Sequence, residues 1–190
     1  MKYWFIACLA CLSCATGAVA GGKHGHHHHH HEHHEEHRQL SAHEHGSGNF
    51  NIAIEGKKVS MELESPGADI VGFEYEATTD EQKARIAKAK AKLKDIANVV
   101  ALPAAAGCKL EAATVELETE GQDKKTSHSE FRAHYQMTCA QPEKLAEITF
   151  PYFRNFKGAQ KLAVRVVGPK SQKKFEAGRK MTKINLGGLV

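Results

Sequence analysis

The sequence predicts an α+β fold, in which a mainly antiparallel β-sheet domain with one long helix follows a disordered histidine-rich arm. Several stretches alternate apolar and polar residues with a period of two, which is typical of half-buried strands. One stretch, at about residues 80–99, places apolar residues at helical spacing behind a capping sequence. Residues 21–48 contain almost no aliphatic side chains, so they cannot supply a core that would offset the entropy of ordering.

The first half of the domain is predicted to be a hairpin followed by the helix. "NFNIAIEGKKVSMELE" alternates on both sides of a turn at "EGKK", and a Ser-Pro-Gly break at residues 65–67 ends the second strand. "ADIVGFEYE" is predicted to be a further short extended segment. Thr79 and Gln82 form a capping box for the helix. The apolar stripe of the helix is Ile86, Leu93, Ile96 and Val100.

The second half is predicted to be mostly strands. "CKLEAATVELETE" and "SHSEFRAHYQMTC" form two long strands, joined by a polar turn around residues 121–123. A short helix from Pro142 to Ile148 follows. The strands "KLAVRVV" and "KKFEAGRKMTKINL" complete the domain.

The first 20 residues have the three parts of a signal peptide. Lys2 supplies the positive charge, residues 3–12 form an apolar run, and Ala18-Val19-Ala20 is a small-residue cleavage site. The run is too short to span a bilayer core of about 30 Å, so we expect no stable membrane insertion. We therefore expect export and cleavage after Ala20, an arm over residues 21–48 and a sheet domain over 49–190.

Two cysteines remain after the predicted cleavage, Cys108 and Cys139. Two cysteines in an exported chain most simply form one disulfide, and here they stand at the start of one long strand and the end of the other. A thiolate metal site is the alternative, but the mature chain contains no C-x-x-C spacing.

Twelve of the 14 histidines lie in the arm. They are His24, His26, His27, His28, His29, His30, His31, His33, His34, His37, His43 and His45. Neutral imidazole binds zinc, copper and nickel, and the interspersed glutamates add oxygen ligands. We therefore expect the arm to bind several Zn²⁺ ions at moderate affinity, other divalent transition metals being possible. A purification tag would be a clean block, and a passive low-complexity spacer is the remaining alternative.

A second group of ligand types lies on the predicted strand at residues 128–139. Alternation places His128, Glu130 and His134 on one face, together with Arg132. His128 and His134 are six residues apart, about 20 Å along a strand, so one ion cannot bind both. Each would need a partner from a neighbouring strand or from the arm. A polar solvent-facing surface is the alternative interpretation.

Other function classes are disfavoured. H-E-x-x-H does not occur, and the H-x-x-E-H match at residues 33–37 is expected by chance in so biased a segment, so we do not expect an enzyme. Residues 157–190 are basic, with nine lysines and arginines against Glu176. Export and the shortage of stacking aromatics argue against nucleic acid there, and a charged edge strand explains the pattern.

Several stretches are similar to a known family. They are "HEHG" at residues 43–46, "FNIAIEG", "MELESPGADIVGFEYE", "LPAAAGCKLEAATVELE", "HSEFRAHYQMTC" and "FKGAQKLAVRVVGPKSQ". Over about residues 42–172 the chain resembles the ZrgA type of zinc-regulated periplasmic zinc-uptake proteins. His128, Glu130 and His134 match the family's pattern, whereas Tyr75 and Arg132 stand where the family more often has histidine.

The resemblance implies a periplasmic zinc-binding protein that assists zinc import, with zinc ions and an import transporter or its binding protein as partners. The two departures imply a weaker ordered site on the sheet and a larger share of binding by the arm. Two alternatives stay open: a periplasmic store or buffer for zinc, nickel or copper, and a protein-interaction module with a pH-sensitive histidine tether.

Overall fold

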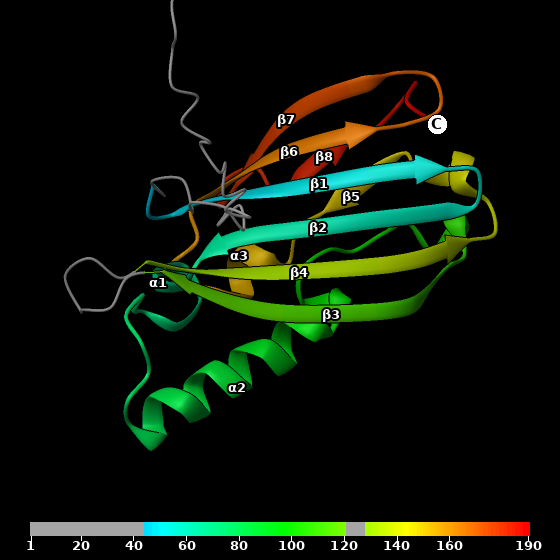
Figure 1. Cartoon of the computed structure of the whole chain (residues 1–190). Coiled ribbons are helices and arrows are strands. Elements are labelled where there is room, and N and C mark those ends of the chain that lie inside the picture. Colours follow the sequence, from blue (N-terminus) through cyan, green and yellow to red (C-terminus); the bar gives the residue numbers. More distant parts are fainter. Residues whose placement is uncertain (1–43, 121–127) are drawn as a thin grey trace, which may run out of the picture. The chain divides into compact units, whose positions relative to one another are not determined.

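The computed structural model describes residues 44–120 and 128–190 (Figure 1). The predicted signal peptide, the arm histidines up to His43 and the predicted turn at residues 121–123 lie outside the described residues. Within the described ranges, no helix has the length and apolar content needed to cross a membrane.

Six strands form the main sheet, in the order β3-β4-β2-β1-β6-β7. Their bounds are Ser47–Glu55 for β1, Lys58–Pro66 for β2, Cys108–Glu120 for β3, His128–Cys139 for β4, Lys161–Val167 for β6 and Gln172–Gly178 for β7. Among these strands β1 and β6 run parallel, and the other neighbours run antiparallel. The predicted class, α+β with mainly antiparallel sheet, is confirmed.

One face of this sheet carries the core. Alternate residues of β1, β2, β4 and β6 are buried, as the period-two pattern predicted. The largest of them are Phe50, Ile52, Leu63, Phe131, Tyr135 and Leu162. Described elements outside the main sheet contribute further core residues, among them Leu93 of α2 (Asp80–Lys94) and Tyr152 of α3 (Tyr152–Asn155).

The predicted long helix is α2, which lies along the β3 side of the sheet (Figure 1). Its capping box is present, because Thr79 Oγ1 accepts the N–H of Gln82 and the Gln82 side chain accepts the N–H of Thr79. The predicted end near residue 99 is wrong. Asp95 ends the helix, and its side chain accepts the N–H of Ala97 to begin a 3₁₀ turn, η1 (Ile96–Asn98).

A buried hydrogen bond connects the helix α2 to the sheet. Tyr135 of β4 donates its hydroxyl to the carbonyl of Leu93 at 2.7 Å. Burial, assisted by the carboxylate of Asp95, raises the pKa of Tyr135 and keeps this donor protonated.

Three short segments differ from the prediction. "ADIVGFEYE" is not extended; it begins with the one-turn helix α1 (Gly67–Val71), which a left-handed Gly72 ends. The segment from Pro142 is only the 3₁₀ turn η3 (Pro142–Lys144), followed by β5 (Glu147–Thr149). The predicted last strand divides into β7 and β8 (Lys183–Asn185), and β8 pairs with β5 in a small second sheet.

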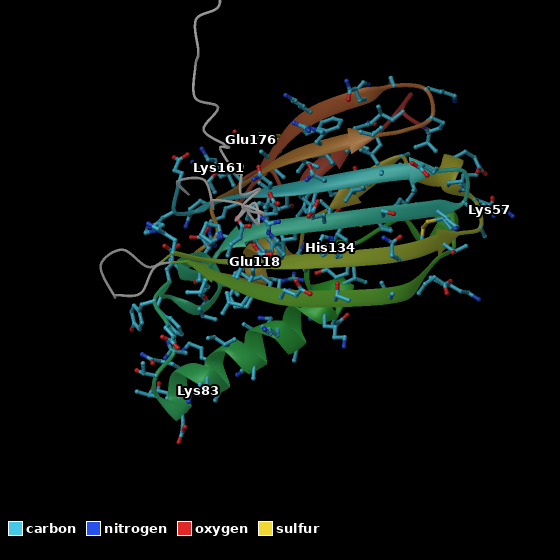
Figure 2. The ribbon with its side chains drawn as sticks, in the orientation of Figure 1. Lys57, Lys83, Glu118, His134, Lys161 and Glu176 are labelled. Atoms are coloured by element: carbon cyan, nitrogen blue, oxygen red, sulfur yellow. A yellow bond between two sulfur atoms is a disulfide. The ribbon has the colours of Figure 1, made fainter. Side chains whose placement is uncertain are left out.

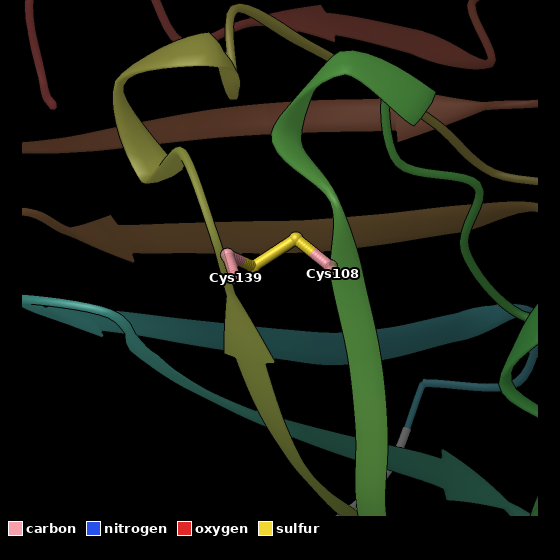
Figure 3. Close-up of a disulfide and its surroundings, with 2 residues drawn as sticks. All are labelled: Cys108 and Cys139. Carbon is pink, nitrogen blue, oxygen red and sulfur yellow. A yellow bond between two sulfur atoms is a disulfide. The ribbon is translucent and has the colours of Figure 1, made fainter.

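The predicted disulfide is confirmed. Cys108, the first residue of β3, is bonded to Cys139, the last residue of β4, and the two are directly opposite in the antiparallel register (Figure 3). A further 3₁₀ turn, η2 (Ala104–Ala106), leads into β3 beside this bond.

The basic C-terminal region contains an edge strand, as its charge pattern predicted. β7 is last in the strand order, and Lys173 and Lys174 are exposed on it. Lysines on an edge strand oppose pairing with another chain.

Candidate metal site at one end of the sheet

The strand register brings three chain segments to one end of the sheet. β1 begins at Ser47, β2 ends at Pro66 and β4 begins at His128, and the antiparallel pairing places Pro66 opposite Glu130 (Figure 1). The last residues of the arm precede β1, and α1 with its following loop continues from β2. Residues distant in sequence therefore meet at this end.

Glu74, in the loop after α1, is the centre of this cluster. Its Oε2 lies 3.4 Å from Nε2 of His45 and 3.3 Å from Nδ1 of His128. The Glu74 side chain is only 10 % exposed, whereas the His45 and His128 side chains are 68 % and 54 % exposed. The carboxylate is thus held inside, and both rings face solvent. We call these three residues the junction cluster.

The second oxygen of Glu74 has an unusual environment. Oε1 is buried and has no hydrogen-bond partner among the residues that the structure describes. A buried carboxylate oxygen without a donor is unfavourable unless a cation or another group satisfies it. The carboxylate therefore has capacity for a further positively charged partner.

The junction cluster contains the donor types that zinc prefers. Two imidazole nitrogens and a carboxylate oxygen occur together in zinc sites that keep an open position. With ligand bonds of about 2.0–2.1 Å, neighbouring donors of a tetrahedral zinc site are about 3.3 Å apart. The two N···O distances, 3.4 and 3.3 Å, are of this size. Among the residues that the structure describes, no three histidine, cysteine or acidic side chains are grouped closely enough to hold a metal ion, so the cluster is only a partial donor set.

Glu74 was not among the residues predicted from the sequence. The prediction treated its segment as an extended strand, which left this acid without a place in the fold. A usable signal was nevertheless present. Glu74 stands between two aromatic residues, Phe73 and Tyr75, and an acid in such surroundings is a candidate for burial with a specific partner.

Tyr75, one of the two departures from the family's pattern, contacts both the loop after α1 and the helix α2. Its ring stacks on Phe73, with centroids 5.1 Å apart, and its hydroxyl accepts a hydrogen bond from Nε2 of Gln82 at 3.3 Å. The side chain therefore connects the loop after α1 to the first turn of α2.

Glu130 takes part in an ion-pair network around Arg132. The guanidinium lies 2.9 Å from Glu130, 3.3 Å from Glu118 and 3.6 Å from Glu64. Burial disfavours the charge on Arg132, but the hydrogen bond to Glu130 and the carboxylates of Glu118 and Glu64 raise its pKa above the ordinary value. Arg132 thus already supplies a cation to Glu130, which was predicted as a metal ligand.

His134 lies partway along β4 (Figure 2), six residues after His128 of the junction cluster. Its Nε2 is 3.7 Å from Oε1 of Glu62 on β2, and the ring is about half exposed. These two residues line a groove on the polar face of the sheet together with Asn51, Ser60, Gln136 and Arg165. His128 and His134 therefore have separate acidic partners.

The arm histidines from His24 to His43 lie outside the described residues. His45 is the one arm histidine that the structure places, and it meets a carboxylate and an imidazole of the folded domain. The folded region also begins earlier than residue 49, since Ser47 and Gly48 belong to β1.

The fold and this donor set define a sheet domain with a candidate transition-metal site where a histidine-rich segment enters it. Comparison with known families agrees with this class: the family described as ZrgA family zinc uptake protein matches residues 42–186. The match covers most of the chain, and the protein belongs to this family, as the sequence resemblance predicted. No curated protein matches the sequence.

Proposed function

We propose that the protein is exported to the periplasm, binds several Zn²⁺ ions through its histidine-rich arm and assists zinc import. Membership of a zinc uptake family supports a role in zinc transport. The signal-like first 20 residues and the Cys108–Cys139 disulfide support an oxidising compartment outside the cytoplasm. A zinc-import transporter or its binding protein receives the ions in this proposal.

One observation carries the proposal. His45, the last histidine of the arm, shares a carboxylate oxygen of Glu74 with His128 of the sheet domain. For a histidine-rich segment that served only as a spacer, we would not expect its last histidine to contact a buried carboxylate beside a second imidazole. The arm and the domain thus supply parts of one donor set.

The two parts have different binding properties in this proposal. The arm offers many imidazoles, so several ions bind there, and each must order a loop of chain. The junction cluster offers fewer donors, but folding has already placed them, so less ordering opposes binding.

The decisive variant is Glu74→Gln, measured where the arm contributes little. In the full mature chain the eleven histidines between residues 24 and 43 are first replaced by glutamine, which keeps the length; we call this the Gln-arm background. There Glu74→Gln should weaken zinc binding by at least about 100-fold, because losing a ligand should exceed the 10–100-fold effect of losing an outer partner. Competition with a chromogenic chelator measures the affinity.

The matched control is Glu76→Gln, which removes an exposed acid two residues away. It should leave the affinity within about 2-fold of the background, because surface charges contribute little at this range. Equal effects of the two variants would reject the junction cluster as a zinc site.

The arm is tested by stoichiometry. Calorimetry of the mature chain should find more than one zinc ion, and the Gln-arm background should lose most of them, since the arm's imidazoles exceed what one four-coordinate ion uses. Unchanged stoichiometry in the Gln-arm background would reject the arm as the main binding region.

A further inference from the structure

A tight turn at residues 44–47 presents His45 to Glu74. The N–H of Ser47 donates to the carbonyl of Glu44 at 2.9 Å and closes the turn. Gly46 adopts φ +84°, in the left-handed region, and a Cβ there would lie 2.9 Å from Cγ of Gln160. Glycine is therefore needed for both conformation and space at the residue that follows His45.

The domain holds this turn through the backbone of Gly46. The N–H of Gly46 donates to Oδ1 of Asp69 at 2.7 Å, in a buried hydrogen bond. The carbonyl of Gly46 accepts from the N–H groups of Gln160 and Lys161, at 2.8 and 2.9 Å. Both polar groups of one arm residue are thus bound by the domain, on two sides.

Asp69 is itself fixed in place. It lies in α1 and is only 5 % exposed. Gly158 packs so closely on its backbone that a Cβ on that glycine would lie 2.5 Å from the carbonyl oxygen of Asp69. An aspartate so buried on a one-turn helix requires a specific partner, and the Gly46 N–H is one such partner.

The same short segment also carries the carboxylate of the junction cluster. Asp69 and Glu74 are five residues apart, separated by the left-handed Gly72 that ends α1. One short segment, from α1 into the loop after it, therefore carries both the side chain that holds the backbone after His45 and the carboxylate that His45 meets.

From this geometry we infer that Asp69 is a positioning residue for zinc: it holds Gly46 so that the His45 ring reaches the site shared with Glu74 and His128. The inference rests on the proposed function of the junction cluster. It also has a reciprocal consequence. If docking of the turn favours zinc binding, zinc binding must favour docking of the turn by the same free energy.

The test is a double-variant cycle in the Gln-arm background, with zinc affinity as the readout. Asp69→Ala should weaken binding by about 10-fold or more, the usual effect of removing a group that orients a ligand. His45→Ala should weaken it at least as much. Asp69→Ala added to His45→Ala should then cause little further loss, because there is no longer a ring to position.

Asp69→Asn is the conservative rescue, since its side-chain oxygen can still accept the Gly46 N–H, and it should restore most of the affinity. If Asp69 had a purely structural role, Asp69→Ala would lower the free energy of unfolding, but its effect on zinc affinity would not depend on His45. Hydrogen exchange gives a second readout: zinc should slow exchange at the Gly46 amide in the wild-type arm context and not in Asp69→Ala.

The outcomes are separable. If Asp69→Ala lowers the zinc affinity equally with and without His45, or does not lower it, the positioning role is rejected. Glu74→Gln still tests the junction cluster as a zinc site in that case. If neither His45→Ala nor Glu74→Gln changes the zinc affinity, both the junction site and this inference are rejected. If Asp69→Ala does not fold, Gly46→Ala strains the same turn and should weaken zinc binding through His45 in the same cycle.

Discussion

Arg132 shows how one residue changes the chemistry of a sheet face. Glu64, Glu118 and Glu130 come from three neighbouring strands and would form a strongly acidic patch without it. Three converging carboxylates could attract a metal ion, but the guanidinium lies between them, offsets one of their charges and donates a hydrogen bond to Glu130. The carboxylate of the junction cluster differs in its partners, because those described for Glu74 are the imidazoles of His45 and His128.

The first prediction is that Arg132→Met destabilises the domain by about 2 to 4 kcal/mol, because it removes the counter-ion of a buried carboxylate. Glu130 is only 4 % exposed, so its charge is poorly solvated once the guanidinium is gone. Urea unfolding measures the change.

Lys183→Met is the matched control for this prediction. Its pair with Glu147, at 2.8 Å, is more than half exposed on both sides, so its loss should change stability by less than about 1 kcal/mol. Equal losses in the two variants would contradict the special role of Arg132.

Among the secondary-structure elements, sequence periodicity predicted the long strands and the long helix but failed for the short elements. The hairpin of β1 and β2, the pair of β3 and β4 and the helix α2 each have enough residues for a pattern to show. α1, β5 and β8 have 5, 3 and 3 residues, which is too few for a period to show. β5 exists because it pairs with β8, which no local signal indicates.

The second prediction concerns the disulfide that joins β3 and β4. Its loop spans a sequence separation of 31 residues, for which the chain-entropy estimate is about 3 to 4 kcal/mol of stabilisation. Replacing both cysteines by serine should lower the free energy of unfolding by about this amount. Alkylation followed by mass spectrometry should find no free thiol in exported protein before reduction.

A reductant provides the control for this second prediction. Dithiothreitol should destabilise the wild-type protein and leave the double serine variant unchanged. Two alkylated cysteines in unreduced native protein would contradict the prediction.

In the whole molecule, the sequence predicted the ligand types of the site but not their combination. His45 and His128 were both candidates, because neutral imidazole is a common ligand of transition metals. They meet at Glu74 because the start of β1, the end of β2 and the start of β4 lie at the same end of the sheet. The strand order and register determine this arrangement. His45, in the part of the arm that the structure describes, thus lies beside two of the domain's own donors.

The last prediction concerns pH, because zinc and protons compete for the same imidazole nitrogen. An unperturbed histidine side chain has a pKa near 6.5, so such a ring is mostly neutral at about pH 7.5 and mostly protonated at about pH 5.5. Affinity should therefore fall as pH falls. A site of three imidazoles loses about a factor of 10 per ring over this range, about 4 kcal/mol in total.

Glutamates offset part of this loss, since Glu32, Glu35 and Glu36 stay ionised in the same range. We therefore expect the zinc affinity of the mature protein to fall by at least about 100-fold between these pH values. Circular dichroism should show the sheet domain still folded at the lower pH, and a competing chelator measures the affinity. An affinity that hardly changed would mean that carboxylates dominate binding, and capture of zinc by arm histidines would have to be abandoned.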